Sequence, residues 1–147
     1  MSYSIKEIAD MMGVTTATLR YYDKEGLLPN VKRVNGIRVF EDKDFKWLRV
    51  LNCLKNTNMP IKEIKRYVEL SKEGDKTLQE RYDLILKQEK RILEDIRQFN
   101  HYLKEIEFKK TYYREAIRAG SEEAVKDWPS SYPSLDLDKI PSSKKGK

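Results

Sequence analysis

The chain has 147 residues, enough for one domain with a buried core or for a small domain followed by an extended element. Its net charge is +6, and residues 1–70 carry 13 Lys and Arg against 9 Asp and Glu, which favours a polyanionic partner for that part. One Cys and one His exclude an intrachain disulfide and a thiolate–imidazole metal site within one chain. No apolar run has the length of a membrane span or a signal peptide, so we expect a cytoplasmic protein without metal or other cofactor.

Two short helices joined by a tight turn are predicted at the N-terminus. Ser4 and Glu7 have the spacing of a capping box, apolar residues follow at helical spacing, and Gly13 ends this first helix. Thr15 is the expected N-cap of a second helix that runs to about Glu25. This arrangement is the helix-turn-helix, a motif that places its second helix in the major groove of DNA.

The second helix is expected to have one apolar side and one polar side. Helical periodicity turns Leu19 and Tyr22 toward the first helix. The outer side then carries small and basic residues: Thr16, Ala17, Arg20 and Lys24. Small side chains allow close approach to base edges, while Arg20 and Tyr21 are long enough to reach phosphates.

A basic β-hairpin is predicted directly after the second helix. Asn35-Gly36 lies between β-branched residues and is typical of a two-residue turn, in which both positions need a positive φ. This turn places Arg33 directly across from Arg38 on one face of the hairpin. Such a like-charged pair either holds a phosphate between its members or consists of two solvated side chains that splay apart.

Two further helices complete the predicted N-terminal domain, residues 1–75. Residues 42–57 form a third helix with apolar residues on one face, and Pro60 sits at the first turn of a fourth. Gly74 and Asp75 end that helix. We therefore expect a mainly α fold that begins with a winged helix-turn-helix domain of four helices and one hairpin.

Residues 76–119 are predicted to form one long dimerisation helix. Positions spaced by strict 4-3 alternation are mostly apolar, which is the pattern of a coiled-coil seam. These positions are Leu78, Tyr82, Ile85, Glu89, Ile92, Ile96, Phe99, Leu103, Ile106, Lys110, Tyr113 and Ile117. No other helix of comparable length is expected in the chain, so the seam should be buried against a second copy.

The two charged seam residues favour an antiparallel homodimer. Glu89 and Lys110 would lie opposite each other in an antiparallel pairing centred between Phe99 and Asn100. In a parallel pairing each would face its own copy, which is a clash of like charges.

Residues 120–147 form a Pro- and Ser-rich tail, with at most one turn of helix at 121–127. Its apolar residues are Trp128, Tyr132, Leu135 and Ile140. They either dock on the dimer and cap a pocket, or belong to a disordered segment.

Three stretches of the chain resemble the MerR family of bacterial transcription regulators. They are TLRYYDKEGLLP, KRVNGIRVF and DKDFKWLRVL, and with the long helix the resemblance covers residues 3 to about 118. It implies a homodimer that binds a pseudo-palindrome in double-stranded promoter DNA and distorts that DNA so that RNA polymerase can engage the promoter. It also implies a set of DNA-contacting residues: Thr16, Ala17, Arg20, Tyr21, Arg33, Arg38 and Lys55, with Tyr22 nearer the core.

Two positions in the sequence bear on the effector, Thr77 and Cys53. Thr77 stands near the position of a cysteine in metal-sensing members of the family, and no cysteine follows residue 53, so metal sensing is disfavoured. The surroundings of Cys53 resemble the branch that responds to aldehydes and other electrophiles through one cysteine. Arg49 and Lys55 lie near in sequence and would favour the reactive thiolate. The alternative is a small apolar residue on the flank of the third helix.

An enzyme is disfavoured, because no glycine-rich phosphate loop and no catalytic Cys, His and Asp arrangement is present. The competing interpretation is a coiled-coil adaptor whose basic small domain binds protein or RNA. A polar recognition helix followed by paired wing arginines favours DNA.

Overall fold

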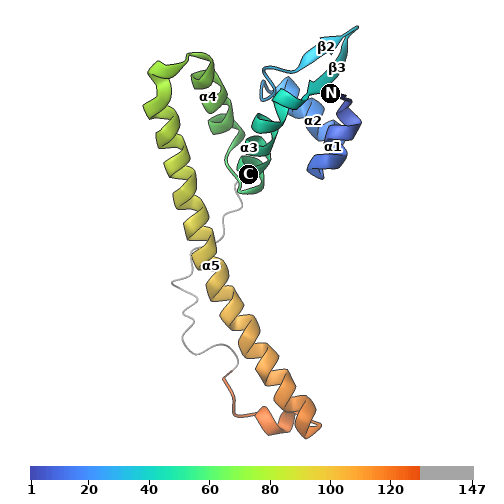
Figure 1. Ribbon diagram of the computed structural model, residues 1–147. Coiled ribbons are helices and arrows are strands. Elements are labelled where there is room, and N and C mark those ends of the chain that lie inside the picture. The colour runs from blue at the N-terminus through green and yellow to red at the C-terminus, as the bar shows by residue number, and fades with distance from the viewer. Residues whose placement is uncertain (130–147) are drawn as a thin grey trace. The chain divides into compact units, whose positions relative to one another are not determined.

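The computed structural model of the protein describes residues 1–129, and these fall into two compact units, residues 1–88 and residues from 89 onward. Unit 1 contains helices α1 to α4, a small sheet and the beginning of α5 (Figure 1). Unit 2 contains the rest of α5 and the turn that follows it.

Helices α1 (Ile5–Met12) and α2 (Thr16–Lys24) form the predicted helix-turn-helix. Ser4 Oγ accepts a hydrogen bond from the Glu7 N–H at 3.1 Å and the Glu7 side chain accepts one from the Ser4 N–H at 2.9 Å, which confirms the capping box. Gly13 ends α1 with φ +69°, a value that favours glycine. Thr15 caps α2 by accepting a hydrogen bond from the Thr18 N–H at 3.0 Å.

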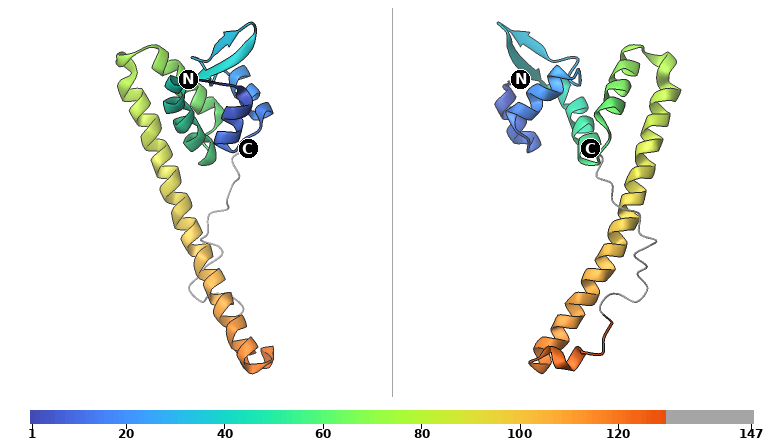
Figure 2. Two further views of the ribbon diagram at one scale, coloured as in Figure 1. Left: turned by 45° about the vertical axis from the view of Figure 1, so that its right-hand side comes forward. Right: turned by 180° about the vertical axis from the view of Figure 1, so that it is seen from behind.

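The sheet has three short antiparallel strands in the order β1-β3-β2. Strands β2 (Lys32–Val34) and β3 (Ile37–Glu41) form the predicted hairpin, which projects beyond α1 and α2 in both views of Figure 2. Strand β1 (Ser2–Tyr3), which the sequence analysis did not predict, pairs with the other edge of β3.

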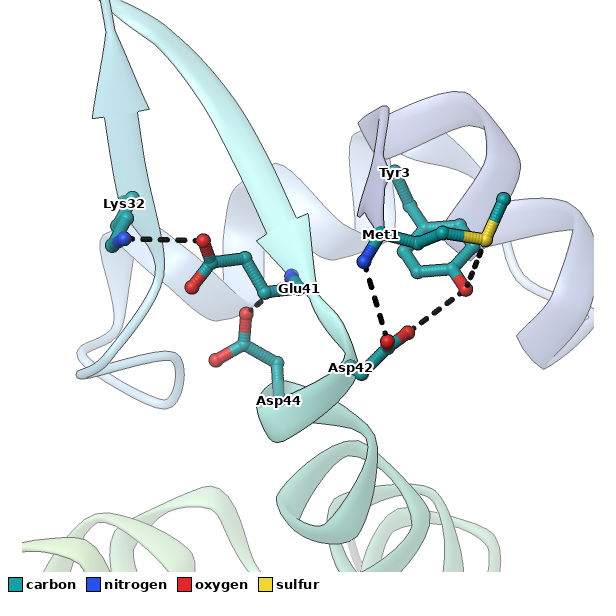
Figure 3. Close-up of polar contacts among 6 residues, drawn as sticks. All are labelled: Met1, Tyr3, Lys32, Glu41, Asp42 and Asp44. Carbon is teal, nitrogen blue, oxygen red and sulfur yellow. Dashed lines mark hydrogen bonds and ion pairs between the residues drawn. The ribbon is translucent and has the colours of Figure 1, made fainter.

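Polar contacts around Asp42 hold β1 in place (Figure 3). The Tyr3 hydroxyl donates to Asp42 Oδ1 at 2.9 Å, and the N-terminal ammonium lies 3.3 Å from Asp42 Oδ2. The hydrogen bond from Tyr3 lowers the pKa of Asp42, and a hydrogen bond from Lys32 lowers the pKa of Glu41 in the same way. The contacts with Asp42 therefore add to the pairing of β1 with β3.

Helices α3 (Phe45–Asn56) and α4 (Ile61–Lys72) complete the core of unit 1. The third helix was predicted to begin at residue 42, but residues Asp42–Asp44 form a single 3-10 turn, in which the Asp44 carboxylate accepts the Glu41 N–H at 2.8 Å. The most deeply buried side chains come from all parts of the unit: Ile8, Leu19, Leu27, Phe40, Leu51, Met59, Ile64 and Leu70.

Helix α5 (Leu78–Ala119) begins within unit 1. Leu84 packs against the core, and the buried Gln88 side chain donates hydrogen bonds to the Thr57 carbonyl at 3.0 Å and to Thr57 Oγ1 at 2.7 Å. The first turns of α5 thus belong structurally to the N-terminal unit. The division into residues 1–75, 76–119 and 120–147 is one by role and stays a prediction.

In unit 2 a 3-10 turn (Glu122–Val125) follows α5, within the predicted single turn of helix at 121–127. Trp128 lies against α5, with its ring centroid 5.9 Å from that of Phe108 and 6.0 Å from that of Tyr112. The predicted docking of Tyr132, Leu135 and Ile140 lies outside the described residues. None of the helices in residues 1–129 is long and apolar enough to cross a membrane.

Candidate nucleic-acid interface

Helix α2 has the predicted polar outer side. Leu19 and Tyr22 are buried, and burial raises the pKa of the Tyr22 hydroxyl, so Tyr22 belongs to the core. The outer side is exposed except at half-buried Thr16, and its members are Thr16, Ala17, Arg20, Tyr21 and Lys24. Arg20 Nη1 donates to Thr16 Oγ1 at 3.3 Å, so the side chains that would face DNA follow one line along the helix.

The hairpin has the predicted register. Arg33 pairs with Arg38 and Val34 with Ile37, and the turn residues Asn35 and Gly36 have φ values of +52° and +78°. Arg33 Nη1 also donates to the Gly36 carbonyl at 3.2 Å, which fixes this arginine along the turn.

A carboxylate from α2 joins the two wing arginines. Asp23 Oδ2 accepts a hydrogen bond from Arg33 Nη2 at 2.8 Å and one from Arg38 Nε at 2.6 Å. The two arginines therefore do not splay apart, which was one of the two expectations from the sequence. A phosphate held between them stays a prediction. Asp23 is the counter-ion that lets two like charges stand directly across a hairpin.

These contacts fasten the wing to the helix that would read DNA. The side chains of Asp23 and Arg38 are only 19% and 20% exposed, whereas that of Arg33 is 50% exposed. The segment between α2 and β2 is also held, because Leu27 and Leu28 are buried and Trp47 Nε1 donates to the Leu27 carbonyl at 2.6 Å. Helix α2 and the hairpin therefore present one fixed surface.

Lys55 is not shown to belong to this surface. It is half-buried on α3, and no hydrogen bond or ion pair within residues 1–129 connects it with α2 or the hairpin. Its contact with phosphate stays a prediction, as do the DNA contacts of the residues on α2 and the wing.

Cys53 lies on α3, and its side chain is exposed. Its carbonyl accepts a hydrogen bond from Thr57 Oγ1 at 2.8 Å, and Thr57 is the residue that Gln88 of α5 contacts. The cysteine is therefore linked to the first turns of the long helix through two hydrogen bonds. Its proposed role as a thiol sensor stays a prediction.

Most of the seam of α5 is exposed in the part of the chain that the structure describes, residues 1–129. Its apolar members are between 38% and 79% exposed, except for half-buried Ile92. The residues predicted to mediate dimerisation all belong to it: Ile85, Ile92, Ile96, Phe99, Leu103 and Ile106. A line of this length differs from the single exposed apolar side chains of an ordinary surface.

Asp23 was not predicted from the sequence as part of the site. The sequence did contain an indication of this role. Two arginines that face each other in a hairpin need a nearby acid, and Asp23 stands near the end of the preceding helix. Identifying it required the angle between α2 and the hairpin, which depends on tertiary packing.

Comparison with known proteins gives consistent matches. A sequence model described as the MerR HTH family regulatory protein matches residues 3–71. An HTH-type transcriptional regulator of Haemophilus influenzae is 45% identical over 126 residues, which cover 85% of this chain and 93% of that protein. The HTH-type transcriptional regulator AdhR of Bacillus subtilis is 37% identical over 92 residues, 62% of this chain and 66% of that protein.

A solved structure extends the similarity to the fold. HiNmlR, a MerR family regulator that lacks the sensor domain and was crystallised bound to promoter DNA, matches with a TM-score of 0.77 and 45% identity. The match covers 84% of this chain and 99% of that chain.

Proposed function

Because the chain belongs to the MerR family of transcriptional regulators and is not an enzyme, we propose that it binds double-stranded promoter DNA through α2 and the β2–β3 wing. The observation that carries this proposal is the fixed surface on which Asp23 joins the exposed side of α2 to two wing arginines. A helix of this kind fits the major groove, and the wing then lies along the adjacent backbone.

The length and charge of each side chain determine whether we expect it to contact bases or phosphates. Thr16 and Ala17 stand at the start of α2, where small residues let the helix approach base edges. The remaining predicted contacts go to phosphates, from Arg20, Tyr21, Arg33, Arg38 and Lys55. Base contacts then supply the sequence preference and phosphate contacts supply most of the affinity.

A homodimer is proposed to bring two such surfaces to one pseudo-palindromic site. The exposed seam of α5 supports this, because burying it against a second copy removes a long apolar line from water. Glu89 opposite Lys110 favours the antiparallel pairing. The bound dimer would distort the DNA between its half-sites so that RNA polymerase engages the promoter, and such a regulator works in the cytoplasm beside the chromosome.

We propose further that a thiol-reactive electrophile acts through Cys53. Exposure of the side chain gives such a molecule access, and the hydrogen bonds through Thr57 connect the cysteine to α5. Cys53→Ser should leave promoter affinity within about twofold and abolish the response of a reporter gene to aldehydes. Undiminished induction in this variant would remove Cys53 from the mechanism.

Footprinting on the promoter upstream of the protein's own gene, followed by titration at several salt concentrations, tests DNA binding. We expect a protected palindromic site, affinity that falls steeply with salt, and a preference of about a thousandfold or more over random duplex. Absent binding or a salt-insensitive interaction would instead favour an adaptor that binds protein or RNA.

A further inference from the structure

Resting on this proposed function, we propose that Asp23 is a positioning residue that makes DNA binding selective. Its carboxylate fixes the two wing arginines in one arrangement and reduces their attraction for phosphates that arrive in any other geometry. Asp23 itself would touch no base. It acts through Arg33 and Arg38, the partners of its Oδ2 atom.

The hydrogen bonds leave a defined set of donors for DNA. An arginine has five N–H groups in a rigid planar fork. Arg38 uses only Nε, at Asp23, so the plane of its guanidinium is fixed while both terminal amino groups make no hydrogen bond with the described residues. Arg33 is fixed twice, at Asp23 and at the Gly36 carbonyl. Both arginines are thus arranged before any duplex arrives.

The charge of Asp23 has an effect opposite to that of its hydrogen bonds, because it reduces the attraction of the two arginines for phosphate. The two arginines and Asp23 together carry a net charge of +1, where the arginines alone would carry +2. Asp23 and Arg38 are both about four-fifths buried, so solvent screens this neutralisation only in part. Random duplex gains chiefly from charge, whereas a fully docked site also gains from the fixed positions of the donors. Removing the carboxylate should therefore help random duplex and harm the preference for the promoter site.

A merely stabilising ion pair would behave differently. If Asp23 only held the wing folded, its loss would weaken binding to every duplex alike. The loss of Asp23 would then leave the ratio of the affinities for promoter site and random duplex unchanged. This would hold in chains with and without the two arginines.

The test uses the full chain with Asp23→Asn, which keeps the shape of the side chain and removes its charge. Asp10→Asn is the control, because it removes one charge from an exposed ion pair of α1 and changes the net charge equally. Affinities are measured for a duplex carrying the footprinted site and for a scrambled duplex of equal length over a range of salt. Thermal unfolding is checked first, and Asp23→Ser replaces the Asn variant if that variant does not fold.

We expect Asp23→Asn to lower the ratio of the two affinities about tenfold and to steepen the salt dependence on random duplex by about one phosphate equivalent. Asp10→Asn should leave the ratio unchanged. In a chain that also carries Arg33→Ala and Arg38→Ala, assayed at lower salt to restore binding, Asp23→Asn should no longer alter the ratio.

A decrease of less than about threefold, or a decrease that persists without the two arginines, overturns the role of Asp23. These results are distinct from failure of the proposed function. That failure would show as a native chain without preference for any promoter duplex, whereas a selective native chain with an equally selective Asn variant defeats the inference alone.

Discussion

The charged side chains of the wing in unit 1 and the apolar side chains of the α5 seam differ in where they find contacts. In unit 1 the charged groups of the wing find partners within the same chain, with Asp23 between Arg33 and Arg38. Along α5 most of the apolar seam is exposed beside the described residues of its own chain. The first region is therefore prepared before it meets DNA, whereas the second region would be covered only in the proposed dimer.

A charged residue in the seam should have the largest effect, because it would remove the apolar surface that distinguishes α5 from unit 1. Leu103→Glu places a carboxylate where the proposed dimer buries a leucine, and two such groups per dimer should weaken association more than about a hundredfold. Analytical ultracentrifugation measures the dimer dissociation constant directly. Promoter affinity should decrease with it, since each monomer would contact only one half-site.

The adjacent residue supplies the matched control. Lys104→Glu changes the next position on the same helix, which lies outside the 4-3 alternation and is exposed. It should leave the dimer intact. If both variants dimerise as the native chain does, α5 does not use this seam.

Removing the link between α3 and α5 should have a smaller effect, on the stability of unit 1. Gln88→Leu removes the hydrogen bonds to Thr57 and leaves a part-buried carbonyl without that donor. The cost should be about 1–3 kcal/mol in the free energy of unfolding, measured by urea denaturation.

Gln79→Leu is the control for this change on the same helix. Gln79 is exposed and donates only to Asp83, at 2.9 Å, so its replacement should change stability by less than about 0.5 kcal/mol. Equal effects of the two substitutions would mean that the contact with Thr57 contributes no more than a surface hydrogen bond.

The sequence predicted those parts of the fold that are determined by neighbours along the chain. The capping box of Ser4 and Glu7, the left-handed Gly13 and the Asn35-Gly36 turn are local, and the structure confirms all of them. The outer side of α2 followed from helical periodicity alone.

The missed features all depend on packing between distant segments. The strand at Ser2–Tyr3 is too short to give a pattern and exists because β3 offers an edge. Asp23 contacts wing arginines that lie 10 and 15 residues later in the sequence, and Gln88 contacts Thr57, which lies 31 residues earlier. The spacing of residues in the sequence does not encode such contacts, so the counter-ion of the wing arginines could be recognised only in the structure.

The smallest expected effect concerns pH and the fastening of β1. The folded-state pKa values of Glu41 and Asp42 are lowered, chiefly by hydrogen bonds from Lys32 and Tyr3 respectively. A carboxyl group with a lowered pKa stabilises the fold above its ordinary pKa and loses that contribution as pH falls through the folded-state value. The contacts of Asp42 with β1 and of Glu41 with Lys32 should therefore weaken below about pH 4, and only slightly, because both groups are at least partly exposed to solvent and salt.

Tyr3→Phe isolates one of these contacts. It removes the hydroxyl that donates to Asp42, so the pKa of Asp42 should rise toward its ordinary value, as measured by NMR titration of the side-chain carboxyl carbon. Glu41 keeps Lys32 as its partner and is the internal control. A rise at both carboxyl groups would mean that the substitution also disturbs the contact of Glu41 with Lys32. A rise at Asp42 alone would show that this carboxylate depends on its own partner within the chain, unlike the seam residues of α5, which would all be covered by one proposed partner helix.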